Sequence, residues 1–175
     1  MDAKFEYLLR QGDNALILSQ QLSQLCGKGP ALEDDMALTD VTKNPKYLAA
    51  MVSMGASNHW QLGPRTYFAD DQCVGQTYCE LFFKLHDERM IAPMRKQFDQ
   101  ILAQPREFPT LDFTQKGIGD AWSWCDSLFM APPAWIRLWK ATADERYLNF
   151  AVTNWWRTSD YLYDKDEHLY FRDSR

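Results

Sequence analysis

The sequence predicts an all-α fold built from antiparallel helical hairpins, and three observations support this prediction. Three segments share one pattern, in which a helix ends, a tight polar turn follows and another helix starts; they are residues 42–51, 86–94 and 142–151. Between them, apolar residues recur at the three- and four-residue spacing of an amphipathic helix. The apolar and polar alternation that is typical of strands is hardly visible. We expect roughly six helices, paired as hairpins.

The turn of each segment carries residues that favour the start of a helix. An Asn or Asp cap, an early proline or an acidic residue suits the exposed N–H groups and the dipole there. The pairs are Asn44-Pro45, Asp87-Glu88 and Asp144-Glu145, and the matching positions in the helices that follow are Tyr47, Met90 and Tyr147. These anchors are 43 and 57 residues apart, which fits a helical hairpin plus a variable loop.

Composition and charge exclude several classes of protein. The net charge of −5, with no basic run, argues against nucleic-acid binding, because phosphate neutralisation needs clustered Lys and Arg. No stretch approaches the ~20 apolar residues of a membrane span, and the N-terminal region is charged where a signal peptide is apolar. We therefore expect a cytoplasmic protein. The four Cys and three His lack metal-ligand spacing, so no metal site is predicted.

Two longer loops, about residues 57–70 and 104–123, contain Gly63-Pro64, Pro105, Pro109, Gly117 and Gly119. The first leads to Asp70 and Asp71, and the second leads to Asp126. Functional side chains often lie where such loops enter a rigid scaffold. An Asp before a helix is also a common N-cap, so capping and catalysis are alternative interpretations of these residues. Of the first pair, Asp71 is the better candidate for a cap and Asp70 for catalysis.

From about Thr39 to the C-terminus, three stretches resemble one family of enzymes. They are GPRTYFADDQCVGQTYCELF, AWSWCDSLFMAPPAWIRLWKATADERYL and DEHLYFRDSR, and the pattern W-x-W-C-D-x-L-F-M-x-P-P in the second is the most specific. The chain here resembles the unsaturated glucuronyl and rhamnogalacturonyl hydrolases of glycoside hydrolase family 105, which is related to family 88. The resemblance implies a partial (α/α)6 barrel, or toroid, because it covers the N-terminal half of the family's barrel. Since an open half-barrel exposes apolar faces, we expect self-association.

The resemblance also implies an activity and a partner. The activity is hydration of the 4,5-unsaturated uronic acid at the non-reducing end of lyase-degraded pectin or rhamnogalacturonan. A carboxylic acid protonates carbon 4, water adds at carbon 5, and the unstable hemiketal opens and releases the next sugar. The expected partner is an oligosaccharide that carries this unsaturated sugar, and no metal or organic cofactor is required.

In this family an aspartate of the tryptophan-containing motif is the general acid and base, and its position here is Asp126. A second aspartate assists, which the resemblance places at Asp70, with Asp71 as the close competitor. Physical chemistry supports such a pair, because a second carboxylate raises the pKa of the one that must hold a proton. A partly desolvated setting raises it further, and aromatic side chains near Asp126 can supply that setting.

Asp71 and four other residues are expected to bind the substrate. Trp122 and Trp124 are candidates to stack on a sugar face, and Lys116 or Arg172 can meet the uronate carboxylate. Relatives often carry a His where this chain has Gln115 and another near Arg172, so recognition of the uronate is expected to differ. Trp at helical spacing is more often a core residue than a sugar platform, and this alternative stays open.

Residues 1–38 resemble a different family, the structural, ferritin-like subunit of bacterial phenylacetyl-CoA monooxygenase. The stretch that carries the resemblance is YLLRQGDNALILSQQLSQLCGKGPALEDDMAL. Its apolar spacing predicts an amphipathic helix that ends at Gly27 and Gly29-Pro30. We therefore expect two units, a helical segment at 1–38 and a partial barrel at 39–175. The chain has no Glu-x-x-His pair for a di-iron site, so the alternative function is a non-catalytic helical scaffold subunit.

Overall fold

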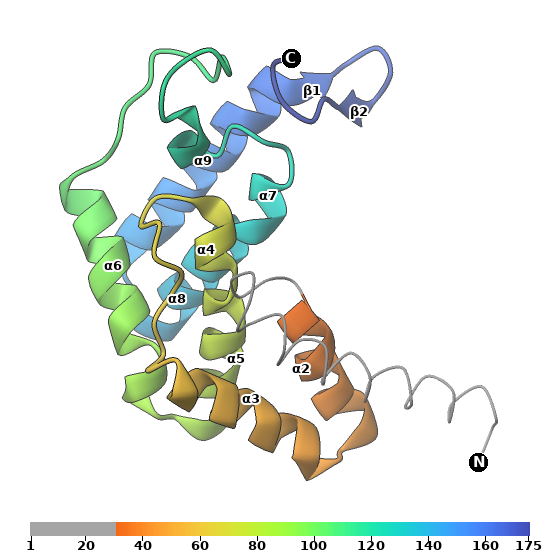
Figure 1. Ribbon diagram of the computed structural model, residues 1–175, viewed down its shortest axis with the longest axis vertical. Helices are drawn as coiled ribbons and strands as arrows, with labels where there is room; N and C mark the ends of the chain where they lie inside the picture. Colours follow the sequence, from red (N-terminus) through yellow and green to blue (C-terminus); the bar gives the residue numbers. More distant parts are fainter. Residues whose placement is uncertain (1–30) are drawn as a thin grey trace.

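The structure, a computed structural model, describes residues 31–175 and confirms the all-α prediction for this part of the chain (Figure 1). The helix predicted before Gly27 lies outside the described residues. The longer helices are α2 (Ala31–Thr42), α3 (Pro45–Ser57), α5 (Gly75–Leu85), α6 (Ala92–Ala103), α8 (Pro132–Thr142) and α9 (Glu145–Leu162). Two short helices, α4 (Ala69–Cys73) and α7 (Ser127–Met130), precede α5 and α8. The 3-10 helices are η1 (Glu88–Met90) and η2 (Ile118–Ala121).

Two of the predicted hairpins are packed pairs, α2 with α3 and α8 with α9, and at the third predicted turn α5 leads through η1, which contacts both, into α6. Helix α5 contacts both α2 and α8, and α6 contacts α9. The first helices of the hairpins therefore lie side by side in one layer, and α6 and α9 lie next to each other outside it (Figure 1). This is an arc of an (α/α)6 toroid. No helix within residues 31–175 is long and apolar enough to cross a membrane.

Each hairpin turns at the predicted segment by the same local device. The residue that follows the first helix has a left-handed backbone; these residues are Lys43, His86 and Ala143, with φ values of 56°, 54° and 58°. The next side chain accepts a hydrogen bond from the backbone N–H two positions further on; these capping residues are Asn44, Asp87 and Asp144. The three predicted anchors, Tyr47, Met90 and Tyr147, are buried. The turns are thus specified by a few adjacent residues.

The two layers are held together by an aromatic stack around Trp135 of α8, which is fully buried. Its ring lies between Phe98 of α6 at 3.9 Å and Phe150 of α9 at 4.1 Å, measured between ring centroids. The indole Nε1 donates to Gln72 Oε1 of α4 at 2.8 Å. Because one side chain contacts three elements, it fixes α4 relative to both outer helices.

The C-terminal part forms a small β-hairpin that the sequence analysis did not predict. Strands β1 (Tyr163–Asp164) and β2 (Leu169–Tyr170) pair antiparallel, with Tyr163 opposite Tyr170. The Asp164 carboxylate accepts two backbone hydrogen bonds that close the turn. Strands of two residues are too short for an alternating pattern to be visible.

The expected boundary between residues 38 and 39 falls inside α2. Met36, which precedes this boundary, is buried in the main core together with residues of α3, α5 and α8. The division of the chain into units at 1–38 and 39–175 stays a prediction, and α2 packs as part of the second unit.

Candidate active site

The two candidate catalytic aspartates lie where α4 and α7 lead into two neighbouring inner helices. Asp70 is in the first turn of α4, and Asp126 directly precedes α7. Helices α4 and α7 contact each other, as do α5 and α8, into which they lead (Figure 1). Gln76 of α5 strengthens this junction, because its Nε2 donates to the Phe129 carbonyl of α7 at 3.1 Å. The fold therefore brings together two carboxylates that are far apart in sequence.

The side chain of Asp126 is exposed and makes no capping hydrogen bond to α7. Asp70 is half-buried, and its pKa is raised above the ordinary value. Burial is the main cause, and the charge of Asp126 raises the pKa further. Arg65 acts in the opposite direction. Asp126 therefore lies close enough to Asp70 for its charge to act on that carboxyl group.

Asp71 has a different role from the one expected for it. Its side chain is buried, and its carboxylate accepts hydrogen bonds from Arg65: the backbone N–H at 2.7 Å, Nε at 3.2 Å and Nη2 at 2.7 Å. The N-cap position of α4 is occupied by Phe68, which makes no capping bond, so the prediction that Asp71 caps a helix is wrong. Asp71 anchors the loop before α4, and its carboxylate is already occupied by Arg65.

The two motif tryptophans are placed differently. Trp122 is 3% exposed and packs edge-on against Phe150 at 5.7 Å, so it offers no free ring face and is a core residue. Trp124 is half-buried and contacts Phe68 at 5.5 Å and Phe113 at 5.2 Å. The Trp124 Nε1 atom is buried and has no hydrogen-bond partner among the described residues. We therefore retain Trp124, but not Trp122, as a candidate sugar-binding residue.

Both candidate cations, Lys116 and Arg172, are exposed. The Arg172 carbonyl accepts a hydrogen bond from the Cys125 N–H at 2.9 Å, which places this residue beside the loop of Asp126. Lys116 belongs to the loop of Phe113, whose ring contacts Trp124 and whose N–H donates to Ser174 Oγ at 2.8 Å. The loop before η2, the loop before α7 and the C-terminal tail thus meet on one side of Asp126.

The sequence analysis missed Arg65, a cation that acts on both consecutive aspartates, Asp70 and Asp71. Its guanidinium binds Asp71, lies over the Phe68 ring at 3.7 Å and lowers the pKa of Asp70. The signal was an Arg between Gly63-Pro64 and two consecutive Asp residues, because a loop cation beside paired acids commonly neutralises one of them.

The site can perform acid–base chemistry with the groups that the chain itself supplies. One carboxyl, Asp70, has a raised pKa, and a second, Asp126, is open to a ligand; general acid–base catalysis needs such a pair. Among residues 31–175, no group of three or more His, Cys, Asp or Glu side chains is placed to hold a metal ion.

The described residues thus form an arc of a helical toroid, with two neighbouring carboxyl groups where short helices lead into its inner layer. Residues 28–175 match Glycosyl Hydrolase Family 88, and the chain belongs to this family. The resemblance noted in the sequence is confirmed.

Two curated relatives carry the same name, unsaturated 3S-rhamnoglycuronyl hydrolase. The protein from Alteromonas sp. (strain LOR) is 34% identical over 121 residues, which are 63% of this chain and 29% of the relative. The protein from Formosa agariphila is 32% identical over 139 residues, which are 77% of this chain and 36% of the relative. The chain spans about a third of the length of these curated relatives.

Two solved structures share the fold. Glycosyl hydrolase family 88 from Bacteroides vulgatus superposes with a TM-score of 0.67 at 24% identity, over 80% of this chain and 41% of that chain. A polysaccharide lyase superposes with a TM-score of 0.65 at 23% identity, over 79% of this chain and 40% of that chain. These similarities support the assignment of the fold as a partial toroid.

The N-terminal segment matches a second family, as its sequence indicated. Residues 1–45 match the phenylacetic acid catabolic protein family. One of the subunits of 1,2-phenylacetyl-CoA epoxidase from Escherichia coli (strain K12) is 54% identical over 35 residues, which are 20% of this chain and 14% of the relative.

Proposed function

We propose that this chain acts as a hydrolase of unsaturated uronyl oligosaccharides, by hydration of the 4,5-unsaturated uronic acid at the non-reducing end. Membership of family 88 and the names of the two curated relatives support this substrate class. The observation that carries the proposal is the pair Asp70 and Asp126, held at adjacent helix entries and coupled by charge.

In the proposed reaction Asp126 transfers the protons. Its carboxyl group protonates carbon 4 of the unsaturated ring, water adds at carbon 5, and the water loses a proton to the resulting carboxylate. The hemiketal then opens by breaking the bond between carbon 5 and the ring oxygen, which leaves carbon 1 as a hemiacetal. This hemiacetal collapses to an aldehyde, and the next sugar leaves with its oxygen protonated by the hemiacetal hydroxyl proton. Asp70 assists as the neighbouring carboxyl group, because the charge of Asp126 acts on it and the two lie at adjacent helix entries.

The remaining contacts position the sugar. Trp124 belongs to the same loop as Asp126 and is half-buried, so part of its ring is available to a sugar face. Arg172 and Lys116 come from the two segments that flank the Asp126 loop, and either can pair with the uronate carboxylate. Asp71 supports the site through Arg65 instead of contacting the sugar.

The test follows the ultraviolet absorbance of the unsaturated uronate in lyase-digested pectin. The wild type is expected to remove the absorbance, and Asp126→Asn is expected to slow this by at least about 100-fold, as is typical for loss of a general acid. Asp166→Asn, an exposed aspartate in the β-hairpin turn, is the matched control. Equal rates for wild type and Asp126→Asn would contradict the role of Asp126, and no absorbance change with wild type would contradict the activity.

We further propose that the chain associates with a second copy of itself. A face shared by α8 and α9 exposes Ile136 (39%) and Val152 (42%) beside an apolar cavity of about 200 Å³. Contiguous apolar surface of this kind marks an interaction site. We expect a concentration-dependent dimer by light scattering, and Val152→Lys should shift it to monomer. A wild type that stays monomeric at high concentration would exclude this interface.

The second candidate function, a helical scaffold subunit, is favoured by one observation, the 54% identity of the N-terminal segment to the epoxidase subunit. The two proposals differ in whether the part of the chain from residue 31 onward carries hydrolase activity. A chain that starts at residue 31 keeps α2 and should retain hydrolysis if the family 88 part is the functional unit. Loss of hydrolysis with unchanged thermal unfolding would assign the N-terminal segment a part in the reaction.

A further inference from the structure

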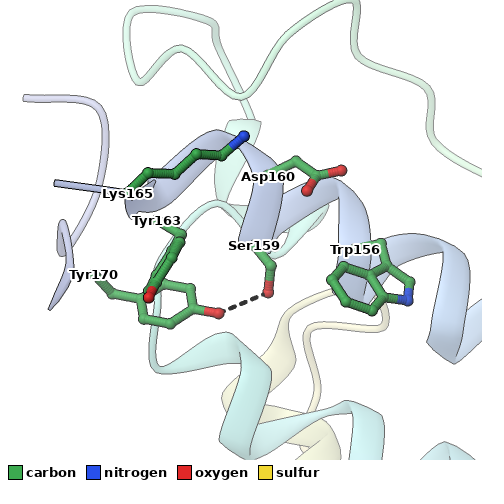
Figure 2. A pocket seen from close by; sticks show the side chains of 6 residues that line it. All are labelled: Trp156, Ser159, Asp160, Tyr163, Lys165 and Tyr170. Carbon is green, nitrogen blue, oxygen red and sulfur yellow. Dashed lines mark hydrogen bonds between the residues drawn. The ribbon is translucent and has the colours of Figure 1, made fainter. Parts of the chain in front are cut away.

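A separate pocket of about 160 Å³ lies between the C-terminal turns of α9 and the β-hairpin (Figure 2). No residue of this pocket belongs to the site described above. It is lined by Trp156, Ser159, Asp160, Tyr163, Lys165 and Tyr170.

Aromatic rings form two sides of the pocket. Tyr163 and Tyr170 pair across the β-hairpin with ring centroids 5.1 Å apart, and Trp156 lies on the opposite side (Figure 2). All three are partly open to solvent, at 37%, 40% and 57% exposure. Aromatic faces carry partial negative charge, so they attract the C–H groups that cover one face of a pyranose ring. Such rings offer this contact at little cost in conformational entropy.

The polar groups of the pocket include two hydroxyl groups that bond to each other and two charged groups at its mouth. Ser159 Oγ and Tyr170 OH lie 2.9 Å apart, and this hydrogen bond orients the tyrosine ring (Figure 2). Lys165 and Asp160 are exposed at the mouth, and within the described part of the chain neither forms an ion pair or a side-chain hydrogen bond. A carboxylate can accept hydrogen bonds from sugar hydroxyls, and an ammonium group can donate to hydroxyl or carboxylate oxygens.

Hydrogen bonds to backbone carbonyl groups connect the walls of the pocket to the segment that carries Asp126. The Thr158 hydroxyl, in the last turns of α9, donates to the Trp122 carbonyl at 2.8 Å. After β2, the Phe171 N–H donates to the Leu162 carbonyl at 2.9 Å, and the Arg172 carbonyl accepts from Cys125 at 2.9 Å. Both walls of the pocket are therefore bonded to the segment that carries Asp126.

We propose that this pocket is a second sugar subsite, which binds a pyranose ring of the oligosaccharide portion that the reaction releases. The ring lies between the tyrosine pair and Trp156, Asp160 accepts from its hydroxyl groups, and Lys165 contacts a hydroxyl or a uronate carboxylate. This inference rests on the proposed function, which determines the part of the oligosaccharide that reaches the pocket. It adds a binding site for a sugar beyond the reacting one.

The test uses binding of trigalacturonate, a saturated uronic acid trisaccharide that lacks the reactive double bond, to the whole chain by calorimetry. Tyr163→Ala and Lys165→Ala are each expected to weaken binding at least about 5-fold, from loss of a stacking face or a charge-assisted hydrogen bond. The controls are Tyr161→Ala and Lys96→Ala, which remove an exposed tyrosine and an exposed lysine outside the pocket. Tyr163→Phe keeps the ring and should bind nearly as well as wild type.

Failure of the subsite and failure of the proposed function are distinguishable, because trigalacturonate binding needs no catalysis. Asp126→Asn should abolish the absorbance change and leave this binding in place. Binding by Tyr163→Ala equal to that by Tyr161→Ala would overturn the subsite, and so would the absence of binding by wild type. Thermal unfolding of each variant identifies a general loss of folding, and in that case Lys165→Ala, which shortens an exposed side chain, decides.

Discussion

Arg65 and Asp71 are joined by three hydrogen bonds, from the backbone N–H, Nε and Nη2 of Arg65 to the Asp71 carboxylate. The carboxylate is buried, whereas the arginine side chain is 56% exposed. This contact fixes the loop before α4 against the helix that carries Asp70. Its strength comes less from the ion pair, which solvent screens, than from the buried acceptor that holds a backbone N–H.

Replacement of Asp71 should therefore destabilise the protein. Asp71→Ala leaves the Arg65 N–H without its partner, and we expect a loss of about 2 kcal/mol in the free energy of unfolding. Urea denaturation measures it, with exposed Asp166→Ala as the control. A loss as small as that of the control would mean that the loop is held by other contacts.

The pKa of Asp70 should respond in opposite directions to its two charged neighbours. In the wild type its protonation midpoint is expected above the ordinary aspartate value. Asp126→Asn removes a repelling charge and should lower this pKa, whereas Arg65→Gln removes an attracting charge and should raise it. Carbon NMR of the carboxyl groups during a pH titration measures both changes.

A control substitution and the pH dependence of stability complete the prediction for Asp70. Asp166→Asn, which removes a charge that does not act on Asp70, should leave the midpoint unchanged. Because the folded pKa of Asp70 is raised, its contribution to stability is present at low pH and is lost as pH rises through that pKa. A midpoint that is insensitive to both substitutions would mean that the two aspartates do not share a site.

Gly63 should tolerate no side chain. An added Cβ there lies 2.4 Å from Asp71 Cγ, and the Gly63 N–H also donates to the Asp71 carbonyl at 2.8 Å. Gly63→Ala is expected to cost about 1–3 kcal/mol, because the helix start must move away from the loop. Gly119→Ala is the comparison, since its Cβ meets the Phe68 ring at a milder 3.1 Å. Equal thermal unfolding of the two variants would contradict the close approach at Gly63.

Trp135 should be the most sensitive aromatic residue of the hairpin core. Trp135→Phe shortens the stack between Phe98 and Phe150 and leaves the Gln72 Oε1 atom without its donor. We expect a loss of about 2–4 kcal/mol, from the cavity and the unpaired buried acceptor together. Trp139→Phe, where the lost hydrogen bond to Glu145 is exposed, should cost much less. Urea denaturation of both variants gives the comparison.

The hairpins were predictable because their signals are local. Asn44, Asp87 and Asp144 each cap a helix within two residues of a turn, so a short window of sequence contains the device. The pairing of Asp70 with Asp126 could be inferred only from family resemblance, since the contact between α4 and α7 is a property of the tertiary fold.

The features that could not be predicted from the sequence also have physical causes. Helical spacing does not say which of two nearby tryptophans faces the core, and Trp122 is placed there by its contact with Phe150. The role of Asp71 was missed because its partner, Arg65, precedes it in a loop with no regular period. The β-hairpin turns through the Asp164 side chain and a left-handed His168 in place of a typical Asn-Gly pair.

The tight turns of the hairpins and the long loops lie at opposite ends of the helices, because each hairpin turns once and returns. The three capped turns leave little room for insertion, whereas the loops that carry Asp70, Asp126 and the C-terminal hairpin are longer and irregular. Sequence change at the loop end can therefore alter the candidate site without disturbing how the helices are joined. For protein engineering, this chain separates a rigid assembly end from an adaptable recognition end, and libraries confined to the second should keep the scaffold folded.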